Sequence, residues 1–378
     1  MPEPFKEKFN VALITALAET IQDRFPEFTA ENFINSAIKD LDSLELKQRS
    51  MQITEALHQC LPIDFNHFAE IIRAILHPDD NMDMNLARVE KEGVRGWAIM
   101  PLADLVAIRA IPEYFDEGLI LLSELTKRFS AEFAIRDFIL MDLSKAFTTI
   151  TQWTTSDNEH LRRLASEGAR PRLPWGKQLP DLIRDPQPLM PILESLLDDD
   201  SEYVRRSVAN NLNDIAKDNP GFVIDFVACH IATDNRQRMR LLRHACRTLI
   251  KQGEPQILAL FGYTRFTGNT VLTLDTEQVS WGGVVSATLN LSSNSRDNQS
   301  LMIDYVVWHQ KVNGKLAPKV FKWKVIDTWN GASLTLTKKH SFKPVTTRRY
   351  YPGLHKIQVQ INGEVFDEVS FTLMSDKH

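Results

Sequence analysis

The chain has 378 residues, of which 43% are hydrophobic and 25% charged, and its formal net charge at pH 7 is −5. These values exclude disordered and collagen-like chains, and the length predicts two domains or three. The sequence lacks a run of roughly 18–20 hydrophobic residues that could cross a membrane, and residues 1–8 contain no signal-peptide core. The three cysteines lack metal-binding spacing, so we expect no disulfide framework, no metal site and a cytoplasmic protein without membrane association.

Helical spacing dominates the chain up to about Tyr263. One segment places hydrophobic side chains at i, i+3 and i+4 and ends before Pro78, namely Phe65, Phe68, Ile72, Ile75 and Leu76. Few segments of this region alternate with a period of two. We therefore predict an α-helical domain over residues 1–263.

A short motif recurs within this helical region. Residues 156–163 (SDNEHLRR) are repeated as 200–206 (DSEYVRR) and more loosely as 234–240 (DNRQRMR). Leu161 and Val204 are 43 positions apart, and Val204 and Met239 are 35 apart, which is near the period of HEAT-like helix pairs. We expect an Asp or Ser to cap each helix and a hydrophobic stripe to pack on the neighbouring repeat. The prediction is a HEAT-like α-solenoid with a binding surface on its concave face.

The segment EGARPRLPW follows the first repeat helix and contains two prolines that end it. It brings two arginines and a tryptophan near a carboxylate, namely Arg170, Arg172 and Trp175 near Glu167. A simpler interpretation pairs Glu167 with Arg163 on the preceding helical turn and makes Trp175 a core residue. The same simple interpretation pairs Glu132 with Arg136.

The second repeat helix begins at Val204 and carries an unusual polar stripe. Its members are spaced at i, i+3, i+4 and i+7: Ser207, Asn210, Asn211 and Asp214. An ordinary exposed face would be rich in Lys and Glu, whereas amides can orient a carboxylate and a water without neutralising the carboxylate. Local hydrogen bonding between repeats is an equally good interpretation of the stripe.

Five basic residues follow at spacings of 4, 3, 4 and 4: Arg236, Arg240, Arg243, Arg247 and Lys251. This spacing predicts one face of one helix. Because no acidic residue lies between Asp234 and Glu254, these cations have no i, i+4 partners. We interpret the stretch as a track for phosphates in preference to a solvated face.

After Thr267 the period changes from helical to two. Six segments alternate as β-strands: residues 271–274, 286–291, 305–308, 319–326, 333–337 and 357–361. Asn313-Gly314 and Asn362-Gly363 are hairpin candidates, because Asn and Gly tolerate positive φ. Roughly seven strands in about 110 residues predict an immunoglobulin-like β-sandwich over residues 267–378.

The charge differs between the two regions. From Phe266 onward there are 13 Lys and Arg against 9 Asp and Glu, a net charge of +4, while the preceding residues carry −9. Six residues lie close in sequence and are predicted to clamp DNA around one strand and its loop: Lys338, Lys339, His340, Lys343, Arg348 and Arg349. A tethered solubility module is the alternative.

Four runs together are similar to a known family: GWAIMPL (96–102), EFAIR (132–136), EGARPRLPW (167–175) and YVRRSVANNLNDIAKDNP (203–220). They resemble the AlkC branch of the AlkC/AlkD DNA alkylation-repair glycosylases, over roughly residues 1–262. Some members carry a C-terminal immunoglobulin-like domain. The resemblance implies excision of 3-methyladenine-type cationic bases from double-stranded DNA without conventional base flipping. It implies three catalytic carboxylates, Glu132, Glu167 and Asp214. It also implies DNA binding by Trp175, Arg170, Arg172, Arg206, Asn210 and Asn211.

The chemistry agrees with this resemblance. A base methylated on a ring nitrogen is cationic and departs neutral, so the remaining barrier is the positive charge that develops on the sugar. A carboxylate in a dry site opposes that charge, and an indole face attracts the cationic base by ~0.5–2 kcal/mol. We therefore expect a monomeric, monofunctional N-glycosylase without a cofactor. The alternatives are a non-catalytic HEAT scaffold, which the basic and amide-rich faces disfavour, and a protein that binds damage without excision.

Overall fold

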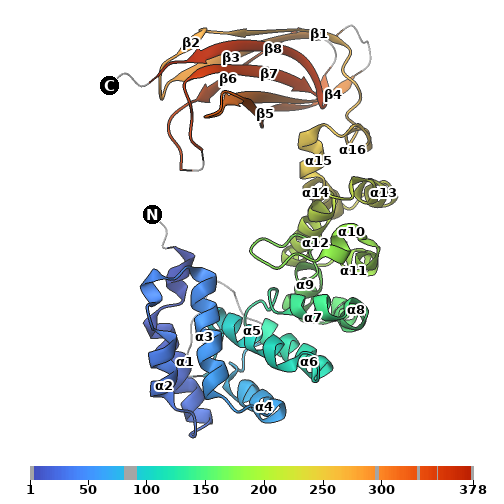
Figure 1. The fold of residues 1–378 in the computed structure, drawn as a ribbon. Helices are drawn as coiled ribbons and strands as arrows, with labels where there is room; N and C mark the ends of the chain where they lie inside the picture. Colours follow the sequence, from blue (N-terminus) through green and yellow to red (C-terminus); the bar gives the residue numbers. More distant parts are fainter. Residues whose placement is uncertain (1–3, 81–91, 294–297, 330–332, 347, 376–378) are drawn as a thin grey trace. The chain divides into compact units, whose positions relative to one another are not determined.

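The computed structural model describes residues 4–80, 92–293, 298–329, 333–346 and 348–375. It consists of two compact units, a helical unit (Met1–Val223 with Thr233–Ala245) and a sandwich unit (Ile224–Ala232 with Cys246–His378). Helices precede strands along the chain, as the change of period predicted (Figure 1). The predicted boundary between residues 263 and 267 stays a prediction, since the helices after residue 245 are grouped with the sandwich unit.

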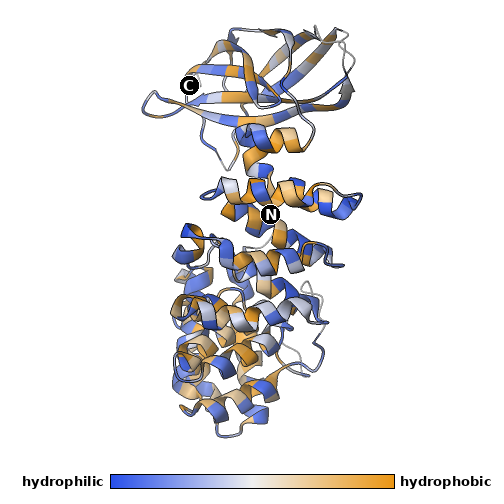
Figure 2. Cartoon of the chain, turned by 90° about the vertical axis from the view of Figure 1, so that its right-hand side faces the viewer, coloured by the Kyte–Doolittle hydropathy of each residue, from blue (hydrophilic) through white to orange (hydrophobic). Residues whose placement is uncertain are grey.

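The helices have the following bounds: α1 (Val11–Arg24), α2 (Ala30–Ala37), α3 (Leu46–Cys60), α4 (Phe65–Ile75), α5 (Ile99–Ala110), α6 (Phe115–Thr126), α7 (Ile135–Met141), α8 (Leu143–Gln152), α9 (Glu159–Glu167), α10 (Pro180–Arg184), α11 (Met190–Ser195), α12 (Glu202–Ile215), α13 (Pro220–His230), α14 (Arg236–Ala245), α15 (Arg247–Gln252) and α16 (Pro255–Leu260). The predicted helix that starts at Phe65 is confirmed as α4, and the Asp64 side chain caps it by accepting from the His67 amide. Hydrophobic and hydrophilic residues mix along the helices, as amphipathic packing requires (Figure 2).

Successive helices of the helical unit stack on one another, with α3 on α5, α9 on α12 and α12 on α14. The three copies of the sequence motif open α9, α12 and α14, so the predicted repeat is confirmed. The expectation that an Asp or Ser side chain caps each helix is wrong in all three copies. Asn158 and Asn235 accept the first backbone amides of α9 and α14, while Ser201 stands at the start of α12 without a side-chain cap bond.

Ion pairs tie neighbouring repeats together at the starts of these helices. Arg162 on α9 donates from Nε and Nη2 to Asp199, at 2.6 and 3.0 Å, and Asp199 lies just before α12. One repeat later, Arg238 on α14 pairs with Asp198. Bidentate pairs of this kind restrict both distance and angle, so they fix how one repeat meets the next.

The strands form two sheets in the sandwich unit. Their bounds are β1 (Gly268–Leu274), β2 (Gln278–Val279), β3 (Val284–Ser293), β4 (Gln299–Gln310), β5 (Leu316–Trp329), β6 (Leu334–Ser341), β7 (Gly353–Ile361) and β8 (Glu364–Leu373). The smaller sheet has the order β1-β3-β6 and the larger β2-β8-β7-β4-β5. Inward side chains of both sheets form one core that includes Leu289, Ile303, Val307 and Val359. All six predicted strands are present, and β2 and β8 are additional.

The two Asn-Gly hairpins are confirmed, but they differ in construction. Asn362 and Gly363 are a two-residue turn between β7 and β8, and both have positive φ, 47° and 82°. The turn after β4 spans residues 311–315, and only Gly314 has positive φ there. Gly363 also approaches Gly253 so closely that a Cβ on Gly253 would lie 2.7 Å from its carbonyl oxygen. The hairpin therefore packs against the turn between α15 and α16.

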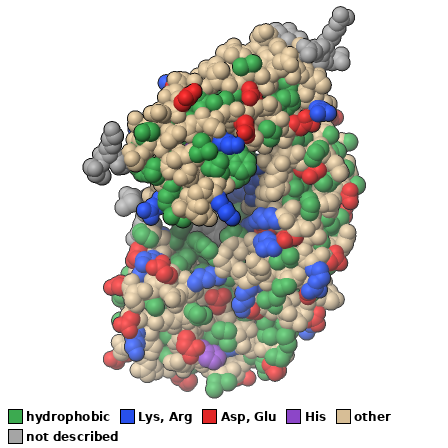
Figure 3. All heavy atoms as spheres, turned by 45° about the horizontal axis from the view of Figure 1, so that its top comes forward, with side chains coloured by type: hydrophobic (Ala, Val, Ile, Leu, Met, Phe, Trp, Pro, Cys, Tyr) green, Lys and Arg blue, Asp and Glu red, His purple; other side chains and the backbone are tan. Residues whose placement is uncertain are grey.

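Charges of both signs mix over the helical unit on the face that Figure 3 shows. The helices that the structure describes are all too short or too polar to span a membrane.

Asn362 provides a test of the sandwich unit. Its side chain accepts from the Met302 amide (2.7 Å) and donates to the Thr264 and Ser300 carbonyls (2.6 and 3.0 Å), and it is buried. Asn362→Ala loses these bonds and puts alanine at positive φ, so we expect a loss of about 2–4 kcal/mol in the free energy of unfolding. Urea denaturation, followed by the fluorescence of the tryptophans in the sandwich unit, measures this free energy. The matched control is Asn313→Ala in the other hairpin, where one exposed bond to the Lys315 amide predicts a loss under about 1 kcal/mol; equal losses would contradict this account.

Candidate functional site

Six charged side chains alternate in sign through the middle of the helical unit. We call them the charge series: Glu132, Arg163, Glu167, Arg170, Asp214 and Lys217. Each member after the first is in ion-pair contact with the one before it. Because neighbours are opposite in sign throughout, every buried charge has compensation on at least one side.

The fold assembles this series from four segments. Glu132 lies just before α7, while Arg163 and Glu167 lie on the last two turns of α9. Arg170 is in the loop that follows α9, and Asp214 is near the end of α12. Because α9 and α12 pack side by side, the loop after α9 reaches the C-terminal turn of α12.

Glu167 is the central carboxylate and is only 5% exposed. Its Oε1 accepts from Arg170 Nη1 at 2.7 Å and lies 3.4 Å from Arg163 Nη2, while its Oε2 accepts from the Ser207 hydroxyl at 2.6 Å. Burial works against the charged form, but the two guanidinium groups and the hydroxyl outweigh it and lower the pKa of Glu167. Glu167 is therefore ionised at neutral pH in a site largely shielded from water.

The simple pairing predicted for Glu132 is wrong. Its carboxylate contacts Arg163 of α9 and accepts from the Ser130 hydroxyl at 2.8 Å. The expected partner, Arg136, is fully buried and donates instead to backbone carbonyls of the loop after α9. The simple pairing of Glu167 with Arg163 is present, but Arg170 is the closer partner.

Arg136 determines the shape of that loop. It donates to the Gly168 and Arg170 carbonyls at 2.9 and 2.8 Å and also to the Lys177 carbonyl. These bonds hold both ends of the loop on one side chain. Within it, Trp175 has φ 63° and is 65% exposed. A bulky residue in the left-handed region costs ~1–3 kcal/mol and frequently marks a functional site. The simpler interpretation of Trp175 as a core residue is therefore wrong.

A cavity of about 440 Å³ opens beside the charge series, a size typical of sites for small organic groups. Its lining is mainly aromatic and apolar and includes two carboxylates, Glu132 and Glu167. The lining residues are Leu46, Lys47, Trp97, Met100, Phe129, Ser130, Glu132, Phe133, Arg163, Glu167, Arg170, Leu173, Pro174, Trp175 and Tyr203. We call this space the aromatic cavity.

The structure brings four of the sequence-predicted residues to this cavity: Glu132, Glu167, Arg170 and Trp175. Asp214 lies behind Arg170, is 1% exposed and is absent from the lining. The prediction that amides surround Asp214 without neutralising it is wrong, because Arg170 and Lys217 each contact it at 2.8 Å.

The other predicted polar residues lie outside the lining. Asn211 is buried and donates to the Ser166 carbonyl at 2.8 Å, which is the inter-repeat bonding considered as the alternative. Asn210 is half-buried on the same helix. Arg172 pairs with Asp218, at 2.6 Å from Nε. Their role in DNA binding stays a prediction.

Several lining residues were not predicted as site residues from the sequence. Trp97, Phe133 and Tyr203 lie inside the quoted family-like runs, so those runs were a usable signal. No sequence signal points to Lys47 or Phe129, because α3 and the segment before Glu132 carry no distinctive pattern. The Lys47 ammonium lies 3.9 Å from the Phe133 ring centroid, and partial burial lowers the pKa of this lysine.

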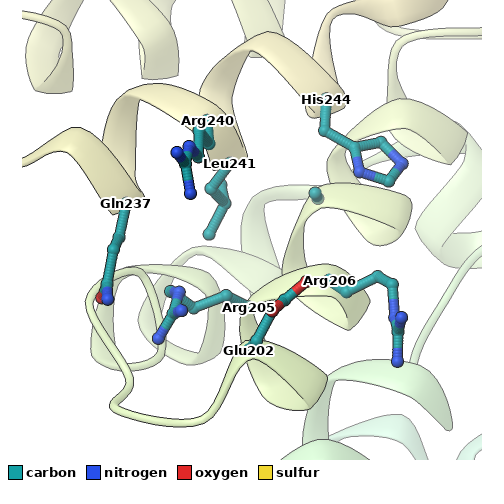
Figure 4. Close-up of a pocket in the computed structure, with 8 residues that line it drawn as sticks. Glu202, Arg205, Arg206, Gln237, Arg240, Leu241 and His244 are labelled. Atoms are coloured by element: carbon teal, nitrogen blue, oxygen red, sulfur yellow. The ribbon is translucent and has the colours of Figure 1, made fainter.

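The predicted single basic helix is wrong. Cys246 interrupts it, so Arg236, Arg240 and Arg243 lie on α14 while Arg247 and Lys251 lie on α15, in the other compact unit. A second cavity, of about 230 Å³, lies instead between α12 and α14 (Figure 4). We call it the basic cavity, and it is lined by Glu202, Arg205, Arg206, Ala209, Gln237, Arg240, Leu241 and His244. Neither Arg206 nor Arg240 forms an ion pair within the described part of the chain.

In the sandwich unit the predicted basic residues do not all lie on one face, although Lys338 and Arg348 lie over the stacked rings of Tyr305 and Phe321. Lys338 and Lys339 are adjacent on β6, so they point to opposite faces of the strand. Arg348 donates to His309 Nε2 at 2.9 Å and lies 5.6 Å from the Phe321 ring, while Arg349 lies over Tyr351. Arg348 and Arg349 share a cleft with Trp281 and Tyr350.

Among the described residues, no three His, Cys, Asp or Glu side chains gather closely enough to hold a metal ion. The expectation that the activity needs no cofactor stays a prediction.

Comparison with known proteins gives the family. Residues 129–249 match the model of the DNA alkylation repair enzyme family, and residues 269–375 match that of the C-terminal Ig-like domain of YhaZ. The uncharacterized protein YhaZ of Bacillus subtilis is 36% identical over 97% of this chain and 98% of its own. The DNA-bound alkylpurine DNA glycosylase AlkC of Pseudomonas fluorescens is 33% identical, with a TM-score of 0.87 over 99% of this chain and all of that one. The chain belongs to the DNA alkylation repair enzyme family, in the group that shares the full length of YhaZ and AlkC.

Proposed function

We propose that this protein is a DNA glycosylase that hydrolyses the N-glycosidic bond of cationic alkylated purines, of the 3-methyladenine type, in double-stranded DNA. One observation carries the proposal: an ionised, nearly buried carboxylate, Glu167, opens onto an aromatic cavity. The similar AlkC structure is that of an alkylpurine DNA glycosylase on DNA containing an abasic-site analogue, which supports the same activity here.

The reaction places two demands on the site: the positive charge on the sugar must be stabilised, and a water must reach C1′. The bond electrons leave with the base, which departs neutral, while positive charge develops at C1′ of the sugar. Water then adds to C1′, and its proton passes to bulk water or to a carboxylate beside it, such as Glu132. Glu167 meets the first demand by stabilising the developing charge, and the aromatic walls, among them Trp175, attract the cationic base before the bond breaks.

The three predicted carboxylates take different roles in this proposal. Glu167 and Glu132 border the cavity, so both can face the sugar or the attacking water. Asp214 is a positioning residue, because it reaches the cavity only through Arg170. A monomeric state, excision without base flipping and DNA contacts by the sandwich unit are further parts of the proposal.

The two alternatives make different demands on the same residues. A protein-binding scaffold could use an aromatic cavity, but it gains nothing from the five buried or half-buried charges of the series, whose desolvation is costly. A protein that binds damage without excision could use both features. Only measurement of the chemical step separates that alternative from catalysis.

The first test replaces the central carboxylate. Glu167→Gln preserves shape but removes the negative charge, so we expect single-turnover excision of 3-methyladenine from duplex DNA to fall ~10²-fold or more. DNA affinity should change little, because the loss concerns the transition state. Release of free base under enzyme excess measures the rate, and fluorescence anisotropy measures the affinity.

Asp218→Asn is the matched control for Glu167→Gln. It removes another carboxylate that is paired with an arginine, Arg172, and that lies outside the cavity lining. Its excision rate should equal that of the unchanged protein. Thermal unfolding of the same preparations is needed, since a purely structural role predicts that activity falls only in proportion to folded protein. A normal rate in well-folded Glu167→Gln would refute the catalytic role.

The second test concerns strand cleavage. A monofunctional enzyme forms no Schiff base, so borohydride should trap no covalent complex with DNA that contains the lesion. Lys47 sharpens this test because it lines the cavity and its pKa is lowered. Trapped protein that disappears in Lys47→Arg would show lyase chemistry at Lys47 and overturn the monofunctional assignment.

The third test concerns the basic cavity. Arg206→Ala combined with Arg240→Ala removes two unpaired cations, so affinity for damaged and undamaged duplex should fall alike. The slope of log affinity against log salt should decrease by ~2. Arg73→Ala with Arg184→Ala is the control, because it removes the same charge from arginines already paired with Glu124 and Asp181. Equal slopes for both double variants would make the basic cavity an ordinary solvated surface.

A further inference from the structure

The aromatic cavity is bounded by side chains whose ring positions need support from elsewhere in the helical unit. Trp175 is the most exposed of them, and its backbone is in the left-handed region. No side-chain hydrogen bond of the Trp175 indole is present among the described residues, so ring contacts fix its orientation. A mobile indole would present its π face to a base for only part of the time.

Phe5 supplies such a contact. Its ring lies edge-on to Trp175, with centroids 6.4 Å apart and planes at 73°. It also contacts Trp97 at 6.0 Å, and Trp97 contacts Phe129 at 5.1 Å. The four rings therefore form one continuous row, and three of them line the cavity: Trp97, Phe129 and Trp175. Phe5 is the member that connects Trp175 to the others.

Arg49 of α3 anchors the segment that carries Phe5. Phe5 opens a single 3-10 turn, Phe5–Lys8, which has little stability of its own. Arg49 of α3 is 2% exposed and donates to the Lys6 and Phe9 carbonyls at 3.1 and 3.0 Å. It also pairs with Glu7 at 3.3 Å. The two Nη groups of this buried guanidinium both bond to residues 6–9, while Nε donates to the Leu44 carbonyl, so Arg49 holds the turn firmly against the start of α3.

Phe5 itself is not buried by this arrangement. Its side chain is 60% exposed, so burial of its own surface does not explain why the turn is held so firmly. Edge-to-face geometry places the positive edge of one ring against the negative face of another and so selects ring orientation as well as distance. The contact with Trp175 therefore has a directional consequence that an aliphatic side chain would not give.

We propose that Phe5 is a positioning residue of the cavity, which holds the Trp175 indole in the orientation that receives the cationic purine. The proposal rests on the proposed function and deepens it, because it extends the lesion site to the segment at Phe5–Lys8. Phe5 acts through Trp175 and does not itself line the cavity.

A double-mutant cycle tests the proposal. Phe5→Ala should lower the single-turnover rate of 3-methyladenine excision about 10-fold, because it loosens the indole, while affinity for undamaged duplex stays unchanged. Phe5→Tyr keeps the ring and should restore the rate to within about 2-fold. In the Trp175→Ala background, Phe5→Ala should cause no further loss. Losses that multiply across the cycle, or a normal rate in Phe5→Ala, would overturn the proposal.

Ile63→Ala is the control for loss of an exposed apolar side chain, since Ile63 is highly exposed and lies outside the cavity lining. Its rate should equal that of the unchanged protein. If Phe5→Ala folds poorly, Phe5→Leu keeps most of the volume without the ring and should still lower the rate several-fold.

A measurement that does not depend on excision separates this inference from the proposed function. Acrylamide should quench tryptophan fluorescence more strongly in Phe5→Ala than in the unchanged protein, and the difference should vanish when both carry Trp175→Phe. Unchanged quenching would refute the positioning role even if the protein excises bases. If quenching changes but the protein excises no base, Phe5 does position Trp175, and the proposed glycosylase activity is refuted.

Discussion

The site depends on the burial of ionised groups in strict alternation. Moving a single carboxylate or guanidinium out of water costs several kcal/mol, and only close opposite charges and hydrogen bonds offset that cost. Glu167, Arg170 and Asp214 are all buried, and each touches a partner of opposite sign. Arg170 is the link between Glu167 and Asp214, and the loop that carries it is fastened by the bonds from Arg136. The same set of bonds therefore positions the loop, the carboxylates and Trp175 relative to one another.

This arrangement restricts what Glu167 can do. Its oxygens already accept from Arg170 and Ser207, and its lowered pKa makes it a weak base. A group of this kind is poorly suited to removing a proton and well suited to stabilising a nearby positive charge. A cationic leaving base needs no proton from the enzyme, so the demand of the proposed reaction and the capacity of the site agree. Glu132, less deeply buried, is the better placed of the two to contact water.

Periodic features could be predicted from the sequence, and the partners of the charges could not. The repeat that opens α9, α12 and α14 and the strands of the sandwich follow from spacing alone, because burial imposes a period on neighbouring residues. Arg136 shows the limit: the i, i+4 rule assigned it to Glu132, whereas Arg163 takes that place across 31 positions. The break at Cys246 was also invisible, since its flanking spacing remains helical. Resemblance supplied Glu132, Glu167 and Trp175 together, which local patterns would have left separate.

The balance of charge indicates how binding and catalysis divide between the charged and the aromatic residues of the cavity. Three negative and three positive groups make the charge series neutral as a whole, so at a distance it exerts little net attraction on a cationic base. Aromatic faces attract cations without carrying a charge, and five aromatic side chains line the same cavity as Glu132 and Glu167. At contact distance the positive and negative members of the series no longer cancel. A positive charge that develops next to Glu167 interacts most strongly with that carboxylate. Recognition of the ground state thus falls mainly to the rings, while the carboxylate acts more strongly on the transition state, and only such a difference accelerates a reaction.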